Sequence, residues 1–181
     1  ADIDVAVLDD DLVEGAETVS VTLTAITSDS PDVSINTAAR AASLDILDDD
    51  AASVSLARVN DGAEAATPAN GRFRVSQTKA STTDTVLSYL VAGTATPGDA
   101  ADYTTLAGTV TIAAGATSAD IVVPVLNDLL VEQTETVVLT LFAVTSGDPD
   151  IDIDQANKTA TVSILDEMTA VSIEAGDAAA S

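Results

Sequence analysis

The 181-residue chain contains no cysteine, no histidine and no tryptophan. Without cysteine it can form no disulfide, no thiolate metal site and no cysteine nucleophile. Without histidine it has neither a Ser-His-Asp triad nor a histidine-ligated metal. The missing cysteine leaves the redox compartment open, because secreted proteins need not contain disulfides. The two lysines, Lys79 and Lys158, lie in strand-like or turn contexts and form no visible pair with a nucleophile, so we expect no enzyme.

Basic residues, aromatic residues and long apolar runs are also scarce. Six Lys+Arg stand against 30 Asp+Glu, for a net charge of -24. Nucleic acids and anionic membrane surfaces attract basic faces, so neither is an expected partner. Four aromatic residues are too few to line a sugar-cleaving cleft built on paired carboxylates; they are Phe73, Tyr89, Tyr103 and Phe142. No apolar run approaches the roughly 18 residues of a membrane helix, and the first residues do not resemble a signal peptide.

The chain is nevertheless rich in apolar residues. They make up 46% of it, and the mean hydropathy is +0.31. Disordered acidic segments combine high charge with low hydrophobicity, which is not the case here. The composition predicts a folded apolar core under an acidic surface. Repulsion on such a surface favours bound cations or salty surroundings.

An internal repeat organises the chain. Residues 1–50 align without gaps on residues 119–168, and about half of the aligned positions are identical, which indicates a repeated module. After one dropped residue, Val54 and Leu56 match Val171 and Ile173. We therefore predict that residues 1–50 are the C-terminal half of one module, that 51–168 are a complete module, and that 169–181 begin the next. Such a tandem array has a separate core in each module.

Apolar residues alternate with polar ones through the complete module, and turn-forming residues separate the runs. This period of two is typical of half-buried strands. About seven short strands in one module predict an all-β, immunoglobulin-like antiparallel sandwich. The inward positions are Phe73, Val75, Leu87, Tyr89, Val91, Val110, Ile112, Ile121, Val123, Val125, Val137, Leu139, Leu141, Ala143, Val162 and Ile164.

Several segments together resemble a Calx-beta domain. They are VLDDDLVEGAETVSVTL and SLDILDDD in the first module, and Asp102-Tyr103, GTVTIAAGATSADIVVPVLND, LLVEQTETVVLTL and TVSILDE in the second. The resemblance covers nearly the whole chain. It implies tandem seven-stranded sandwiches of a family that is not catalytic. The family occurs in sodium–calcium exchangers, an integrin tail and large bacterial surface proteins, and some members bind calcium through acidic loops at one end of the sandwich.

The resemblance also implies calcium ligands, carried over position by position. In the first module they are Asp9, Asp10, the carbonyl of Leu12, Glu14, Asp48, Asp49 and Asp50. In the second they are Asp102, Asp128, the carbonyl of Leu130, Glu132, Asp166 and Glu167, with Glu64 as a further candidate. Such oxygen donors suit calcium, which takes six to eight of them. Glu17 and Glu135 either join the ligands or fix their loops through backbone amides.

The second module matches this ligand pattern less completely. Asn127 and Leu129 stand where the first module has Asp9 and Asp11, so we expect fewer or weaker ions there. The alternative for both modules is a solvated acidic face without calcium.

A third acidic stretch, residues 148–154, has aspartates at alternate positions like the start of an EF-hand loop. The glycine and the distal glutamate that such a loop requires are missing. We predict a long hairpin with Ile151 and Ile153 inward and the aspartates outward; an extra ion site is the alternative.

Together these features predict a structural or adhesive segment of an extracellular, secreted, bacterial repeat protein. It would act as a spacer, fibre or surface-layer element, with calcium stiffening the linker 48–53 between modules. Its partners would be neighbouring modules of the same chain, other copies in a fibre or layer, or a surface receptor. Alternatives are a carbohydrate- or protein-binding module, an accessory region of a secreted halophilic enzyme, and a calcium-sensing module.

Overall fold

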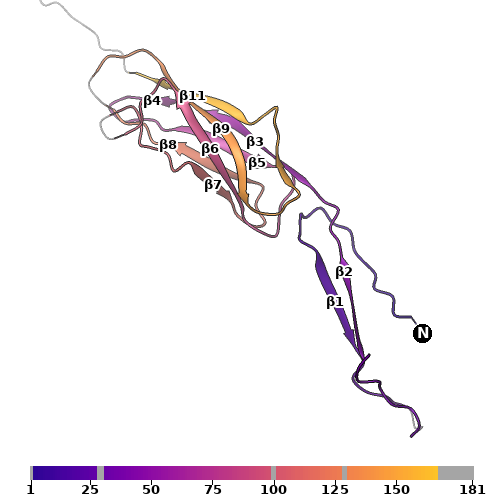
Figure 1. Cartoon of the computed structure of the whole chain (residues 1–181). Helices are drawn as coiled ribbons and strands as arrows, with labels where there is room; N and C mark the ends of the chain where they lie inside the picture. Colours follow the sequence, from indigo (N-terminus) through magenta and orange to yellow (C-terminus); the bar gives the residue numbers. More distant parts are fainter. Residues whose placement is uncertain (1, 28–30, 99–100, 128–129, 167–181) are drawn as a thin grey trace, which may run out of the picture.

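The computed structural model describes residues 2–27, 31–98, 101–127 and 130–166. All regular structure in these ranges is β: eleven strands and no helix. The described residues therefore contain no helix able to cross a membrane. A sandwich occupies the predicted second module, and a two-stranded ribbon extends away from one of its ends (Figure 1).

Two sheets form the sandwich. The first has the order β10 (Ile151–Ile153), β3 (Ala52–Asn60), β5 (Gly71–Gln77) and β8 (Ser118–Val123). The second has the order β4 (Gly62–Ala63), β11 (Thr159–Leu165), β9 (Glu135–Ser146), β6 (Thr85–Gly93) and β7 (Thr109–Ile112). Seven longer strands thus confirm the predicted all-β sandwich. The short strands β4 and β10 come in addition, and they run parallel to β11 and β3.

The chain changes sheets between β3 and β4, and Asp61 holds the crossing. Its Oδ1 accepts a hydrogen bond from the Ser163 amide on β11 at 2.8 Å. The pKa of Asp61 is lowered, first by this bond and then by the Arg58 side chain. The crossing carries the first strand from one sheet to the other, so that the residue after β4 lies beside the end of β11.

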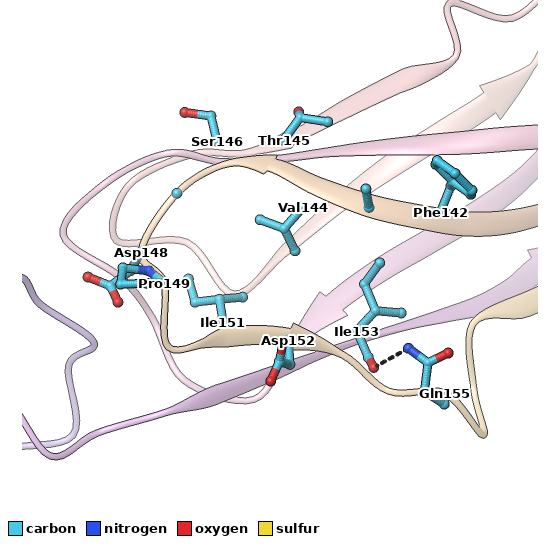
Figure 2. A pocket seen from close by; sticks show the side chains of 12 residues that line it. Phe142, Val144, Thr145, Ser146, Asp148, Pro149, Ile151, Asp152, Ile153 and Gln155 are labelled. Atoms are coloured by element: carbon cyan, nitrogen blue, oxygen red, sulfur yellow. Dashed lines mark hydrogen bonds between the residues drawn. The ribbon is translucent and has the colours of Figure 1, made fainter.

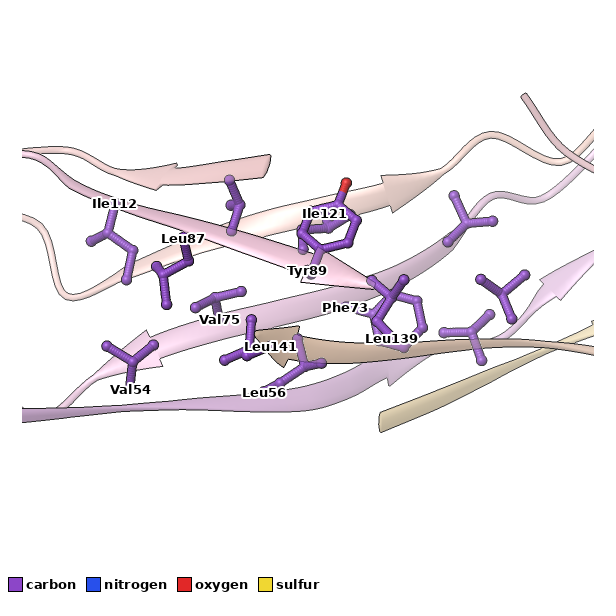
Figure 3. Packing of buried hydrophobic residues seen from close by; sticks show 14 of the residues in the cluster. Val54, Leu56, Phe73, Val75, Leu87, Tyr89, Ile112, Ile121, Leu139 and Leu141 are labelled. Carbon is purple, nitrogen blue, oxygen red and sulfur yellow. The ribbon is translucent and has the colours of Figure 1, made fainter. Parts of the chain in front are cut away.

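Alternate residues of both sheets meet in one core (Figure 3). Phe73, Val75, Leu87 and Leu139 have no exposed surface, and fully burying a side chain of this size contributes about 1.5–3 kcal/mol. All predicted inward positions are buried except two. Val91 is exposed near the end of β6. Ala143 is half-buried because a register shift opposite β6 interrupts the alternation of β9.

The ribbon consists of β1 (Glu17–Thr22) and β2 (Ala41–Ile46). Its register repeats that of the sandwich: Glu17 faces Ile46 as Glu135 faces Ile164 on β9 and β11. Among the described residues, β1 and β2 form a sheet of two strands, and no other sheet packs against it. Exposed apolar residues of the ribbon and of the segments beside it in residues 2–50 include Ile3, Val7, Leu8, Leu23, Leu44 and Leu47.

Candidate metal centre

Three acidic side chains converge at one end of the sandwich. One carboxylate oxygen from each of Glu64, Asp102 and Glu132 lies within 4.8 Å of the others. Glu64 and Asp102 are buried and Glu132 is exposed. Within the described ranges, no other three acids come so close. These residues are therefore the candidate metal centre.

Backbone contacts place the two buried acids. Glu64 directly follows β4, and its amide donates to the Leu165 carbonyl at the end of β11 at 2.7 Å. Asp102 lies in the loop between β6 and β7, where its Oδ2 accepts from the Thr96 amide at 2.6 Å. Its own carbonyl accepts from the Leu126 amide at 2.9 Å. Each buried acid is thus fixed by hydrogen bonds from a different part of the sandwich end.

The third acid lies in the loop before β9. The amide of Glu132 donates to Oδ2 of Asp166 at 2.5 Å. Asp166 follows β11, so this bond ties the loop to the end of that strand. Asp166 therefore holds the loop that presents Glu132, in addition to lying near the centre itself.

Glu135, the first residue of β9, brings a fourth carboxyl group. Its pKa is raised from 4.5 to about 7, first by a side-chain hydrogen bond with Asp102 and then by burial. The charges of Asp102, Glu132 and Glu64 raise it further. Like charges this close favour a proton on one of them when no cation is present. The end of the sandwich thus concentrates negative charge strongly enough to hold a proton near neutral pH.

Gly93 allows this approach. Its φ of 127° lies in the region that favours glycine. A Cβ built there would lie 2.1 Å from the Thr136 carbonyl oxygen, and that oxygen accepts from the amides of Thr94 and Ala95 at 3.0 Å each. The end of β6 therefore lies directly against the start of β9, which brings the loop of Asp102 to Glu135.

The donor set suits a hard divalent cation. It consists of carboxylates, with no nitrogen or sulfur ligand, and calcium binds six to eight such oxygens at about 2.3–2.6 Å. The three carboxylates leave coordination positions for water and for backbone carbonyls of the neighbouring loop. The residues therefore fit calcium better than they fit zinc or copper, which prefer histidine and cysteine.

The sequence predicted part of this cluster. Asp102 and Glu132 do come together, with Asp166 bonded beside them, while Asp128 and Glu167 lie outside the described residues. Leu130 lies in the adjoining loop with its side chain exposed. Glu64, a further candidate whose long loop left its alignment with the family pattern undecided, also belongs to the cluster. Glu135 forms a side-chain hydrogen bond with Asp102, an interaction outside the two roles considered for it, and its spacing from Glu132 was the sequence signal that pointed to the site.

In the first half-module, six predicted or candidate residues line a pocket of about 320 Å³: Asp9, Asp10, Glu14, Glu17, Asp48 and Asp49. Two of them already bond backbone amides. Asp10 Oδ1 accepts from the Leu12 amide at 2.8 Å. Asp48 accepts from Glu14 at 2.7 Å and from Asp50 at 3.2 Å, one through each oxygen.

Asp50 points to a different partner. Together with Asp11 it forms an ion pair with the ammonium of Lys79, at 3.2 Å for Asp11. Hydrogen bonds to Asp50 and then Asp11 raise the pKa of Lys79. The closing acidic run of the first half-module thus meets a lysine of the second module at the junction where we expected calcium to act.

Val13 completes this junction. Its amide donates to the Ala80 carbonyl at 2.9 Å, and its carbonyl accepts from the Thr82 amide at 3.1 Å. It forms a parallel bridge with Ser81, and its side chain is fully buried in the core of the second module. The acidic loop of the first half-module is therefore docked against residues 80–82, between β5 and β6.

The acidic stretch 148–154 follows the predicted alternation in part. Ile151 is buried, Ile153 is half-buried and Asp152 is exposed. Asp148, however, is only 7% exposed, and its Oδ1 accepts a hydrogen bond from the Asp150 amide at 3.0 Å within the turn. The expected hairpin is also wrong in its pairing, since β10 crosses to β3 of the other sheet.

A shallow groove of about 460 Å³ runs between this stretch and the end of β9 (Figure 2). Phe142, 69% exposed, lies at one end of the groove. The other three aromatic side chains are buried in the core: Phe73, Tyr89 and Tyr103. The groove thus offers a ligand one aromatic surface.

Comparison with known proteins agrees with the fold and the acidic end. The Calx-beta domain family matches residues 1–50 and 53–168. A search of curated protein sequences finds no match. The crystal structure of the apo-form Calx CBD1 domain is similar over 66% of this chain and 100% of that chain, with a TM-score of 0.50 and 18% identity.

Two larger structures are also similar. One is CBD12 from CALX1.2, over 63% of this chain and 44% of that one, with a TM-score of 0.48 and 19% identity. The other is the calcium binding domain CBD12 of CALX1.1, over 62% and 44%, with a TM-score of 0.44 and 21% identity. Calx-beta domains include calcium-binding modules, occur in extracellular regions of membrane and surface proteins, and are not a catalytic family. Because the family match spans nearly the whole length, this chain belongs to the Calx-beta domain family.

Proposed function

We propose that the chain is a calcium-binding structural segment of an extracellular repeat protein. The observation that carries this proposal is the convergence of Glu64, Asp102 and Glu132, whose carboxylate oxygens lie within 4.8 Å of one another. The raised pKa of Glu135 beside them supports it. A divalent ion bound among crowded carboxylates offsets their mutual repulsion and displaces a proton held by one of them.

Calcium would join segments that are distant in sequence. Glu64 follows β4, Asp102 lies between β6 and β7, and Glu132 precedes β9. An ion bound only by the folded state stabilises it by about 2.7 kcal/mol at 100 times its dissociation constant. Extracellular calcium is high enough to fill sites with dissociation constants of about 10⁻⁴–10⁻³ M. The ion would therefore hold the end of the module rigid outside the cell.

The role as spacer, fibre or surface-layer element rests on the junction. Val13 and Lys79 hold the first half-module against the second through backbone bonds, burial and charge. Modules joined in this way keep a defined orientation. The adhesive context, a bacterial source and secretion belong to the proposal. So do its partners: neighbouring modules, other copies in a fibre or layer, or a surface receptor.

Calorimetric titration of the chain with calcium tests the ion. We expect binding heat and a higher unfolding temperature in calcium than in chelator. Glu132→Gln removes one charge from an exposed member of the cluster, so it should weaken binding without unfolding the module. Asp152→Asn, an exposed acid on β10, is the matched control and should bind as the wild type does. No heat and equal unfolding temperatures with and without chelator would overturn the proposal.

One observation favours the alternative of a carbohydrate- or protein-binding module. Phe142 is exposed at the groove between β9 and β10, and aromatic faces stack on sugars and anchor protein partners. A glycan array or capture assay comparing the wild type with Phe142→Ala would test it. Binding that disappears in Phe142→Ala would support this second function.

A further inference from the structure

Two valines at equivalent positions of the repeat have opposite surroundings. Val13 is fully buried, whereas Val131 is 67% exposed. The residue before each is a leucine, half-buried at Leu12 and 63% exposed at Leu130. The same short sequence, Leu-Val-Glu, is therefore covered in one module and uncovered in the other.

The local backbone is held in the same way at both places. The amide of Glu14 donates to Asp48 at 2.7 Å, and the amide of Glu132 donates to Asp166 at 2.5 Å. Each bond ties the residue after the valine to the acid that follows the last strand of the module. The loop therefore presents Val131 as it presents Val13, and the difference in burial comes from what lies beyond the loop.

Residues 80–82 lie beyond the first loop. Their backbone exchanges two hydrogen bonds with Val13, from Thr82 and to Ala80, while the valine side chain enters the core of the second module. For Val131, the described part of the chain supplies no backbone partner. The second loop thus carries an exposed apolar surface at Leu130 and Val131.

We infer that Leu130 and Val131 form the docking surface for a further module of the same kind, whose segment equivalent to residues 80–82 receives Val131. The junction at Val13 shows this interface occupied within the same chain. The sequence after residue 168 is continuous with it, because Val171 and Ile173 match Val54 and Leu56 at the start of the module that receives Val13. The inference rests on the proposed function only in that modules follow one another; it does not require calcium.

The chemistry of the expected partner differs from that of the known junction. Lys79 is held by Asp11 and Asp50, and the equivalent positions of the second module are Leu129 and Met168. In a junction of this sequence a lysine would lack both carboxylates that offset its desolvation at the known junction. The module that docks on Val131 therefore carries an uncharged residue in place of Lys79, so the two junctions differ in their preferred neighbours.

An extended chain tests this directly. Residues 1–168 are followed by a second copy of residues 52–181, which keeps the natural phase because the repeat drops one residue here, so that residue 169 occupies the position of residue 52. In one version the appended copy is unchanged, and in another it carries Lys79→Met. Hydrogen exchange is measured at the appended Thr82 amide, the group that bonds the valine carbonyl in the existing junction, in calcium and in chelator.

We expect exchange at that amide to be at least about tenfold slower than in the same chain with Val131→Asp, equivalent to about 1.4 kcal/mol of protection. The Lys79→Met version should be protected more than the unchanged copy. Val33→Asp, an exposed valine of the first half-module, is the matched control and should leave the exchange slow. Val131→Asp in the 181-residue chain should leave the unfolding temperature unchanged, which shows that the variant folds.

Exchange that is equally fast with valine and aspartate at position 131, in both buffers, would overturn the inference even if calcium binds. Protection that depends on protein concentration would assign the surface to a second copy and overturn docking within the chain. If the modules dock but the calcium titration gives no binding heat, the inference stands and only the ion is removed from the proposed function.

Discussion

The carboxylate of Asp48 accepts a hydrogen bond from the backbone amide of Glu14 at 2.7 Å, across 34 residues of chain. The second module repeats this bond between Asp166 and Glu132. In both places an aspartate that follows the last strand fixes the acidic loop that precedes β1 or β9. A residue predicted as a calcium ligand therefore also positions other candidate ligands.

Asp48→Asn should loosen the first loop, because a neutral amide oxygen is a weaker acceptor than a carboxylate. We expect several-fold faster hydrogen exchange at the Glu14 amide. The pKa of Asp48 is lowered, first by this bond, so its stabilisation is present above the unfolded pKa and is lost as the pH falls through the lower folded value. Asp45→Asn on β2 is the control. Equal exchange in the wild type and Asp48→Asn would contradict the proposed role.

Val13→Ala should destabilise the junction by about 1–2 kcal/mol, because it removes buried apolar volume from the core of the second module. Denaturant unfolding measures the change. The same substitution at the exposed Val131 should alter stability by less than about 0.5 kcal/mol. Equal losses of stability at both positions would show that the burial of Val13 does not stabilise the junction.

Lys79→Met keeps the length of the side chain but removes the charge that Asp11 and Asp50 share. We expect a lower unfolding temperature at low salt, with the difference shrinking at high salt as screening weakens the ion pair. Small-angle scattering should show a wider distribution of shapes for the variant. Lys158→Met changes a lysine bonded to Gln155 and should have neither effect; a matching loss there would point to net charge alone.

Glu135 predicts how the calcium-free protein responds to pH. Its folded pKa of about 7 exceeds the ordinary 4.5, so the folded state keeps a proton that the unfolded state loses between these values. Stability without calcium should therefore fall as the pH rises from about 4.5 to about 7 and level off above that.

The same proton competes with calcium. Titrations near pH 6 in buffers of different ionisation heat should show proton release on calcium binding, and titrations near pH 8.5 should show almost none. Glu135→Gln should abolish the release. Identical apparent heats in all buffers at the lower pH would refute this linkage.

Gly93→Ala should destabilise the module by about 3 kcal/mol or more, because the Cβ would collide with the Thr136 carbonyl and the backbone would be strained. It should also weaken calcium binding by separating Asp102 from Glu135. Gly15→Ala, where a Cβ meets nothing within 4 Å, should be nearly neutral in thermal unfolding. A stable Gly93→Ala protein would show that β6 and β9 can separate at little cost.

The strands and the core could be predicted because alternation is a local property of sequence. A residue such as Leu139 or Phe73 points to the same side of its strand whatever the rest of the chain does. Exceptions arose where neighbouring strands fall out of step, as at Ala143 opposite the irregular part of β6. The short strands β4 and β10 were not predicted, because each pairs with a strand of the sheet to which the chain crosses, and that pairing depends on the tertiary structure.

The acidic end was only partly predictable for the same reason. Repeat alignment and family resemblance indicated Asp102 and Glu132, since both lie in recognisable patterns. Glu64 stands in an irregular loop, and its place depends on the pairing of β4 with β11. The proton held by Glu135 follows from three-dimensional proximity to Asp102, which no spacing in the sequence expresses.

The module junction shows this limit most sharply. Composition, alternation and the repeat suffice to predict an acidic β-sandwich, and the family resemblance adds loops suited to calcium, because these depend on each residue's own chemistry and its near neighbours. Leu12-Val13-Glu14 and Leu130-Val131-Glu132 are identical in sequence, yet one valine is buried and the other exposed. Burial depends on which surface folds against a residue, so the role of each valine emerges only when the neighbouring module is in place.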